Sequence, residues 1–352
     1  MTSRKDLVDI ALIKLLEIKD SDLRISILEQ GRSAVDKGIH IGGAFSSVIP
    51  MVCLYYGNIL KYKVEQPTAA GQDLFVLSKG HAVATLASIY ADLGYFPQEV
   101  LKNSRSHASI LNGHPGPILP GVHTATGPLG QGIGFAQGLA LASRCEIGYD
   151  VFALAGDGEL QEGIVWEAVM YSAAKHLDNL CVLVDKNEGQ LDTPKNLLYP
   201  MNWIETAFES FGWKVYSVDA TKYEPVLQAL REFKEGPRTG KPTVIICNTR
   251  KGFGGFSSFM VNHKVELPDA LTEQEITLQK RHRTIRIEEL KLWVHSLPKD
   301  EKERVLSFIR HQAEKIHLFL ELRNQENFFF ESTPGPVRLK RAERRDKKII
   351  YS

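Results

Sequence analysis

The chain has 352 residues, of which 43% are hydrophobic and 24% are charged, and its formal net charge is +1. This composition is typical of a globular protein with one large core or two smaller ones, and the near-neutral charge favours neither nucleic acid nor anionic lipid as a partner. No run of about 18 apolar residues is present, so the sequence predicts no transmembrane helix and no membrane association.

The N-terminal segment and the cysteines indicate the compartment. Acidic residues at positions 9, 17 and 20 interrupt and follow the first apolar run, which favours an amphipathic helix over a signal peptide. The four cysteines, at 53, 145, 181 and 247, lie far apart, and Cys181 and Cys247 sit in strand-like runs. We therefore expect buried thiols rather than disulfides or a zinc site, in a reducing compartment, and a cytoplasmic protein.

The first 62 residues predict helices with a glycine-rich break at 38–43. Residues 63–80 predict a loop leading into FVLSKGH, and a short helix follows over 81–93. The segment 103–132 is rich in Gly, Pro and His and is too long for a mere connector, which raises the expectation that it carries function. A helix of small residues follows it, GFAQGLALASR.

Strands and helices alternate in the centre of the chain. The expected buried strands are 151–155, 180–185, 213–218 and 243–248, and the expected helix is 163–177. Such alternation predicts an α/β fold, with a parallel sheet covered by helices on both faces. Ligands of such sheets bind at the carboxyl ends of the strands.

The composition and the hydrophobic pattern of the sequence change after about residue 264. Residues 1–264 are expected to form the α/β domain, and 265–352 a charged extension that is helical over 271–327. The segment 338–348 holds seven Lys and Arg residues. We interpret this basic run as a solvated or partner-packed tail, because binding of nucleic acid is the less common role of such runs.

Polar residues follow two neighbouring predicted strands. The sequence Gly-Asp-Gly at 156–158 comes directly after one strand, and Asn187 comes after the next. Both strand ends emerge at the same edge of the sheet in a right-handed βαβ unit. Asp157 and Asn187 offer hard oxygen ligands for Mg²⁺, or for Ca²⁺ or Mn²⁺ in its place, and the carbonyl of Gly189 could add a third. Gly158 could offer its N–H to a phosphate.

This pattern has two alternative interpretations besides a metal–diphosphate site. Gly-Asp-Gly alone is a weak signal, since it also occurs in turns that bind nothing. A Rossmann dinucleotide site requires G-x-G-x-x-G after the strand, which is absent here. The complete string GDGELQEGIVWEAVMYSAAKHLDNLCVLVDKNEGQ is far more specific and favours a metal–diphosphate site.

That string resembles the thiamine-diphosphate motif, in which Asn follows GDG by about thirty residues. Three further segments resemble the transketolase family: GIHIGGAFSSVIPMVCLYYG, FVLSKGHAVATLASIYADLGYF and LPGVHTATGPLGQGIGFAQGLALA. The resemblance covers about residues 20–264. It implies the parallel-sheet, diphosphate-binding (PP) domain of that family, with thiamine diphosphate and Mg²⁺ as cofactors.

The resemblance also implies roles for four histidines. His81 and His263 would contact the diphosphate, while His40, His114 and His263 would line the substrate funnel and shuttle protons there. Imidazole suits these tasks because it can donate or accept near neutral pH. Each histidine alone would be interpreted as structural, but all four lie in glycine-rich segments.

Three more residues match positions of the family. Gly127 and Leu129 match residues that meet the aminopyrimidine, with ordinary core packing as the alternative for Leu129. Glu162 matches a carboxylate at the subunit interface that communicates with the partner's activating glutamate, with a plain helix-start acid that favours the helix dipole as the alternative. Ile39 before His40, and His123 before TATG, depart from the family's pattern.

The family's activity implies transfer of a two-carbon ketol unit from a ketose, or its phosphate, to an aldose. Its activating glutamate lies on a pyrimidine-binding domain that this sequence lacks. We therefore expect a subunit of a split transketolase, active in an α₂β₂ assembly with a separate C-terminal subunit; the segment TPGPVRLKRAERRDKKIIYS resembles an interdomain linker. The alternatives are a subunit like 1-deoxyxylulose-phosphate synthase, a 2-oxoacid-decarboxylating subunit, and a non-catalytic scaffold.

Overall fold

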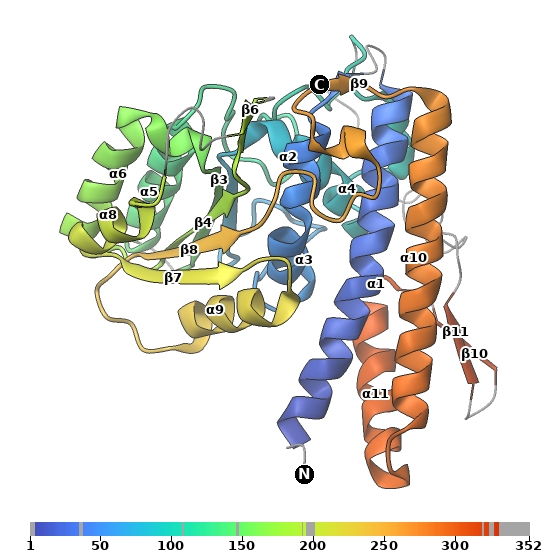
Figure 1. Ribbon diagram of the computed structural model, residues 1–352. Helices are drawn as coiled ribbons and strands as arrows, with labels where there is room; N and C mark the ends of the chain where they lie inside the picture. Colours follow the sequence, from blue (N-terminus) through green and yellow to red (C-terminus); the bar gives the residue numbers. More distant parts are fainter. Residues whose placement is uncertain are drawn as a thin grey trace.

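A computed structural model describes the main body of the chain, a sheet flanked by helices with a bundle of long helices beside it (Figure 1). The described residues are 4–34, 38–107, 109–145, 148–191, 193–194, 201–318, 320–323 and 327–330. The basic segment 338–348, with its linker-like surroundings, lies outside them. Within the described part of the chain, no helix is both long and apolar enough to cross a membrane.

Within the described residues, the main sheet has five parallel strands in the order β2-β3-β4-β8-β7. They are β2 (Leu74–Leu77), β3 (Val151–Gly156), β4 (Leu180–Lys186), β7 (Lys214–Asp219) and β8 (Thr243–Asn248). The four predicted strands are confirmed. The fifth strand, β2, lies within residues 63–80, for which a loop leading into FVLSKGH was predicted. The strand was missed because a run of four residues is too short for its pattern to distinguish a strand from a loop.

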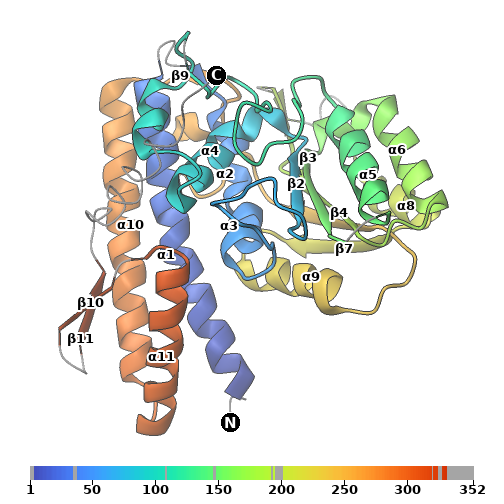
Figure 2. The same cartoon turned by 180° about the vertical axis from the view of Figure 1, so that it is seen from behind.

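Helices cover both faces of this sheet, as predicted. Alternate residues of β3 point to opposite faces, so Val151 and Ala153 belong to one apolar cluster and Phe152 and Leu154 to the other. The first face is covered by α5 (Gln131–Ser143), α6 (Gly163–Ala174) and α8 (Ile204–Ser210). The second is covered by α3 (Val48–Tyr56) and α9 (Tyr223–Glu235), as the two opposite views show (Figures 1 and 2).

A layer of long helices packs beside the second face. In it α10 (Asp269–His295) runs along α1 (Arg4–Ser33), with α11 (Lys299–Lys315) against both. Leu290 of α10 and Leu16 of α1 belong to the same buried cluster as the sheet residues. Shorter helices bring the chain to the sheet edge: α2 (Ile41–Ser46), η1 (Gly80–Ala82), α4 (Val83–Leu93) and η2 (Gln98–Asn103).

The predicted helix over 271–327 is correct only in part. After α11 the chain forms an antiparallel hairpin of β10 (Leu320–Arg323) and β11 (Asn327–Phe330). These strands are rich in Leu and Phe, and the aromatic residues favour a strand over a continued helix.

Short elements complete the described fold around the sheet edge. They are β1 (Gly38–Ile39) paired with β9 (Val265–Glu266), β5 (Gly189–Gln190) paired with β6 (Thr193–Pro194), η3 (Gly158–Gln161) and η4 (Ser258–Val261). The cysteines at 53, 181 and 247 are buried free thiols, as predicted, whereas Cys145 is exposed.

Candidate functional site

Asp157 and Asn187 come together at the carboxyl edge of the sheet, as their spacing predicts. Gly156 of β3 lies in register with Asp185 of β4, which places the two following turns side by side. The backbone N–H of Glu188 donates to Oδ2 of Asp157 at 3.1 Å, so the carboxylate touches the Asn187 turn. Asp157 is 2% exposed and Asn187 5%. Two hard oxygen donors therefore converge on one buried point.

The amide of Asn187 is held in one orientation. Its Nδ2 donates to Ser46 Oγ at 3.2 Å and to Asp185 Oδ2 at 3.3 Å. These bonds fix the amide nitrogen towards the sheet, so Oδ1 turns the other way, where it accepts the N–H of Gly189 at 3.0 Å. An outer carboxylate that orients a ligating side chain is common at metal sites.

A buried ion pair lies beneath this turn. Lys79 donates to Asp185, and the two side chains are 1% and 0% exposed. Lys79 also donates to the carbonyl of Gly43 at 3.0 Å, and Ser46 donates to Asp185 at 2.6 Å. The network joins β2, β4 and α2, so it fixes the segments that carry the candidate residues.

The two glycines of the motif lie in the turns beside Asp157 and Asn187. The N–H of Gly158, expected to face a phosphate, donates to Oδ1 of Asp157 at 2.8 Å in this structure. Gly189 lies in β5, in register with Pro194, which has no N–H to offer its carbonyl. A Cβ at Gly189 would lie 2.6 Å from the side chain of Lys251, so only glycine fits there.

The four predicted histidines gather beside this edge. The ring centroid of His40 lies 5.8 Å from that of His81, 5.9 Å from that of His114 and 4.9 Å from that of His263. The rings of His81 and His263 are 5.5 Å apart. The four residues come from four separate segments, so this convergence is a property of the fold and not of local sequence.

Three of the four histidines, His40, His81 and His114, have lowered pKa values and are held neutral. Burial, with smaller effects from His263, His114 and Arg105, lowers the pKa of His40 to about 3. Burial and the charge of Lys79 hold the pKa of His81 well below its usual range. Burial and Arg105 lower the pKa of His114. Neutral imidazoles at pH 7 can both donate and accept hydrogen bonds.

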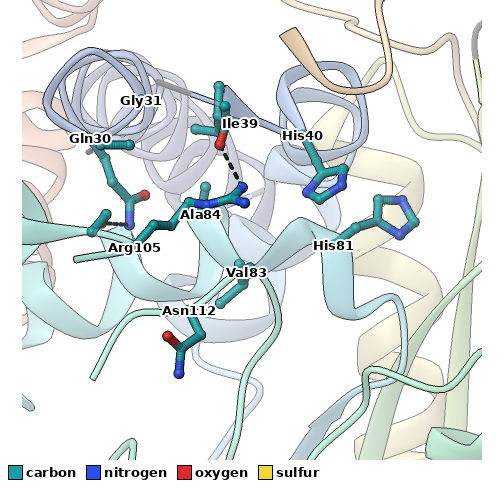
Figure 3. A pocket seen from close by; sticks show the side chains of 13 residues that line it. Gln30, Gly31, Ile39, His40, His81, Val83, Ala84, Arg105 and Asn112 are labelled. Carbon is teal, nitrogen blue, oxygen red and sulfur yellow. Dashed lines mark hydrogen bonds between the residues drawn. The ribbon is translucent and has the colours of Figure 1, made fainter. Parts of the chain in front are cut away.

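Arg105 joins the segments of two of these histidines. Its guanidinium donates to the carbonyl of Gly38 at 2.6 Å, and its backbone N–H donates to the carbonyl of Leu111 at 2.7 Å. With His40 and His81 it lines a small cavity of about 30 Å³, and Figure 3 shows these three side chains. That volume is roughly that of one water molecule.

The TGPLGQG loop lies across the sheet edge with an open side. Thr126 donates to the carbonyl of Leu77 at 2.5 Å, and the N–H of Gly130 donates to Glu159 at 3.1 Å. A Cβ at Gly127 would meet no atom of the described chain within 4 Å. Leu129 is 46% exposed, which argues against the core-packing interpretation of this residue.

Glu162 lies at the surface beside this loop. It occupies the N-cap position of α6, yet its side chain makes no capping hydrogen bond within the described structure. Its place at the start of α6 is also compatible with the alternative of a plain helix-start acid that favours the helix dipole. A Cβ at Gly130 would lie 2.9 Å from Cβ of Glu162 and 2.8 Å from Ile164, so loop and helix are in close contact.

These residues fit a diphosphate–metal group. The donor set of Asp157 and Asn187 consists of oxygens, which suit a hard divalent cation. Oδ1 of Asp185 is buried and has no hydrogen-bond partner among the described residues. The space beside Gly127 is open, because a Cβ there would meet no described atom within 4 Å. The histidine cluster lies close to the same loop: a Cβ built on Gly80 would lie 2.5 Å from Thr126 and 2.9 Å from His114.

Sequence reasoning missed the supporting residues. Lys79, Asp185, Ser46, Glu159 and Arg105 were not singled out, although they hold the site together. Asp185 ends a predicted strand and Lys79 follows a short apolar run, and a charged residue after such a run is a signal that could have found them. Arg105 and Ser46 gave no such signal, because their partners are distant in sequence.

Comparisons with known proteins agree with this geometry. A family model described as "Transketolase, thiamine diphosphate binding domain" matches residues 27–291. Human transketolase is 36% identical over 269 residues, which are 75% of this chain and 42% of that protein. The chain therefore spans less than half the length of this relative.

A second relative is of similar size to this chain. The 6-deoxy-6-sulfo-D-fructose transketolase subunit SqwG of Clostridium sp. (strain MSTE9) is 32% identical over 260 residues, covering 70% of this chain and 90% of that protein.

Solved structures show the same fold. Transketolase from Leishmania mexicana aligns with a TM-score of 0.68 and 26% identity, over 87% of this chain and 45% of that one. Transketolase from Campylobacter jejuni aligns with a TM-score of 0.67 and 28% identity, over 87% and 48%.

Proposed function

The chain belongs to the transketolase thiamine-diphosphate-binding domain family, and from this premise we propose that it is the diphosphate-binding subunit of a transketolase. The observation that carries the proposal is the convergence of His40, His81, His114 and His263 beside the Asp157–Asn187 edge. The proposed reaction transfers a two-carbon ketol unit from a ketose to an aldose.

The residues have distinct tasks in this proposal. Asp157, Asn187 and the carbonyl of Gly189 hold Mg²⁺ on the diphosphate, because oxygen donors suit this cation. His81 and His263 bind the diphosphate oxygens. When bound, thiamine diphosphate supplies the carbon nucleophile for ketol transfer.

The remaining histidines act on the sugar. His40 and His114 are proposed to bind the hydroxyl groups of the donor and to hold or move protons there. Their lowered pKa values support hydrogen bonding to these hydroxyl groups, since a neutral imidazole can both donate and accept. A cationic ring could only donate.

We propose that a separate subunit carrying the pyrimidine-binding domain completes the site. The relative SqwG, which this chain matches over 90% of its length, is itself called a transketolase subunit. The outer faces of α5 and α6, with the loop before α5, also expose apolar side chains, as expected of a surface that another chain covers. They are Leu129, Phe135, Ile164, Met170 and Tyr171, each between 40% and 46% exposed.

The test is a ketol-transfer assay with and without a partner. This chain would be purified alone and together with the product of a neighbouring reading frame that encodes a pyrimidine-binding domain. Fructose 6-phosphate and 6-deoxy-6-sulfofructose would serve as donors in separate arms, with an aldose phosphate as acceptor. We expect turnover only with both chains present, with Mg²⁺ and thiamine diphosphate.

Two outcomes would contradict parts of the proposal. Full turnover by the chain alone would contradict the requirement for a partner. Reaction of pyruvate, with no reaction of either ketose, would favour the subunit types related to 1-deoxyxylulose-phosphate synthase or 2-oxoacid decarboxylation.

His40→Ala in the two-chain enzyme should lower kcat with the ketose donor, because the hydroxyl groups lose a partner.

A further inference from the structure

Glu159 is a buried carboxylate at the centre of the candidate site that has no role in the proposal above. It is 2% exposed and lies in η3, directly after the Gly-Asp-Gly turn. A carboxylate near the start of a helical turn usually stays in solvent, where the helix dipole favours it. Here it is withdrawn from water, which costs free energy unless its oxygens are well bonded.

Three segments donate to this one carboxylate. The N–H of Gly156, at the end of β3, donates to Oε2 at 3.0 Å. The N–H of Gly130, at the end of the TGPLGQG loop, donates to Oε1 at 3.1 Å. The hydroxyl of Ser78, just after β2, also donates to Oε1. Glu159 therefore bridges two strand ends and the loop above them.

The loop has a second attachment at its other end. Thr126 donates to the carbonyl of Leu77 at 2.5 Å. Between the two attachments, Gly127 borders open space within the described structure and Leu129 is half exposed. The position of this open stretch relative to the Gly-Asp-Gly turn is thus set by Thr126 at one end and by Glu159 at the other.

We propose that Glu159 is a positioning residue that fixes the 126–130 loop at a set distance from the Asp157 turn, and thereby shapes the space between them for thiamine diphosphate. The proposal rests on the proposed function for the identity of the ligand. The bridge itself rests on the three hydrogen bonds alone. Glu159 touches neither the metal nor the substrate in this account.

Glu159→Gln tests the bridge with little change in shape. A carboxamide has one acceptor oxygen, so in either orientation it faces the N–H of Gly130 or that of Gly156 with an NH₂ group. One attachment is lost in both cases. We expect faster hydrogen exchange at the amide of Gly130 or Gly156, and thiamine diphosphate affinity in Mg²⁺ reduced about tenfold or more, as for a lost hydrogen bond to a charged group.

Asp73→Asn provides the matched control at the opposite edge of the sheet. Asp73 is also buried, at 7% exposure, and also bridges two segments, by accepting the N–H of Lys61 at 2.9 Å and that of Asp150 at 3.1 Å. This variant should lose stability without changing exchange at Gly130 and Gly156, and without changing cofactor affinity.

The measurements are calorimetric titration with thiamine diphosphate and Mg²⁺, and hydrogen exchange of the full chain without ligand. Unchanged exchange at both amides in Glu159→Gln would overturn the proposal. Unchanged affinity of this variant for thiamine diphosphate, where the wild type binds it, would also overturn the proposal.

If Glu159→Gln does not fold, Glu159→Asp keeps the charge but retracts the carboxylate. Failure of both variants to fold makes Glu159 a general fold residue and overturns the proposal. If the wild-type chain binds no cofactor even with the partner subunit present, the proposed function is contradicted, whereas the exchange result still decides the bridge.

Discussion

The imidazole rings of His40 and His263 meet edge to face, with their centroids 4.9 Å apart. A short backbone pairing explains this contact, because β1 and β9 pair with Ile39 opposite Val265. His40 directly follows β1, and His263 lies two positions before β9. The pairing therefore brings together residues from the two ends of the α/β region, and burial holds the pKa of His40 low.

Acid should destabilise the protein through these histidines. His40 has a folded pKa of about 3, whereas an unfolded histidine titrates near about 6.5. Below pH ~6.5 the unfolded state binds more protons than the folded state, so the free energy of unfolding falls as pH falls towards the folded pKa. Urea unfolding at pH values of roughly 7.5, 6.5, 5.5 and 4.5, which span this window, should show this decline.

His40→Asn should flatten that decline, because the group that takes up the proton on unfolding is removed. His295→Asn is the control, since His295 is exposed on α10. Equal pH slopes for wild type and His40→Asn would show that His40 protonates freely in the folded state.

Gly43→Ala should displace His81. A Cβ at Gly43 would lie 2.8 Å from Cδ2 and 2.9 Å from Nε2 of His81, which is closer than side chains approach. We expect weaker binding of thiamine diphosphate and a cost of about 1–3 kcal/mol from overpacking. Gly138→Ala in α5 is the control, because its Cβ meets no described atom within 4 Å; it should stabilise the chain by about 0.5–1 kcal/mol. Calorimetry and urea unfolding measure both effects.

Lys79→Met should leave Asp185 buried without its cation. Removal of one partner of a buried pair costs about 3–5 kcal/mol of unfolding free energy. Lys222→Met removes an exposed pair with Asp219, in which Lys222 is 71% exposed, and should cost less than about 1 kcal/mol. Similar losses in the two variants, measured by urea unfolding, would contradict the structural role of the buried pair.

The sheet and the meeting of Asp157 with Asn187 could be predicted from sequence. The four predicted strands are long apolar runs, and parallel topology then fixes where their ends emerge. The histidine set could be predicted only through the resemblance to a family, because nothing local in the sequence links His40 to His263. Their contact depends on the pairing of β1 with β9, which has only two residues in each strand.

The supporting contacts could not be predicted. Arg105 reaches Gly38, and Glu159 reaches Gly130 and Ser78, across separations that depend on how the segments pack. β10 was predicted as part of a helix because charged residues continue from α11 without a strong break, whereas all of β11 but its first residue lies beyond that prediction. Short strands and side-chain bridges depend on tertiary contacts, which periodicity alone does not encode.

The exposed face of α5 and α6 provides a prediction about association. Met170→Glu places a charge where a side chain 46% exposed would be covered by the proposed partner. We expect weaker association in analytical ultracentrifugation and an unfolding free energy within about 0.5 kcal/mol of wild type. Leu292→Glu, on α10 and 69% exposed, should leave association unchanged. Equal association of both variants would place the partner elsewhere.

The central claim is that Asp157 and Asn187 hold a metal on the diphosphate of thiamine diphosphate. The most direct test is calorimetric titration of the chain, together with its partner subunit, with thiamine diphosphate, in Mg²⁺ and in a chelator, for wild type and Asp157→Ala. We predict saturable binding of the wild type only in Mg²⁺ and none in the variant, because the remaining oxygens cannot neutralise the diphosphate–metal centre. Equal cofactor affinity of wild type and Asp157→Ala, or affinity that is the same in the chelator, would contradict the account.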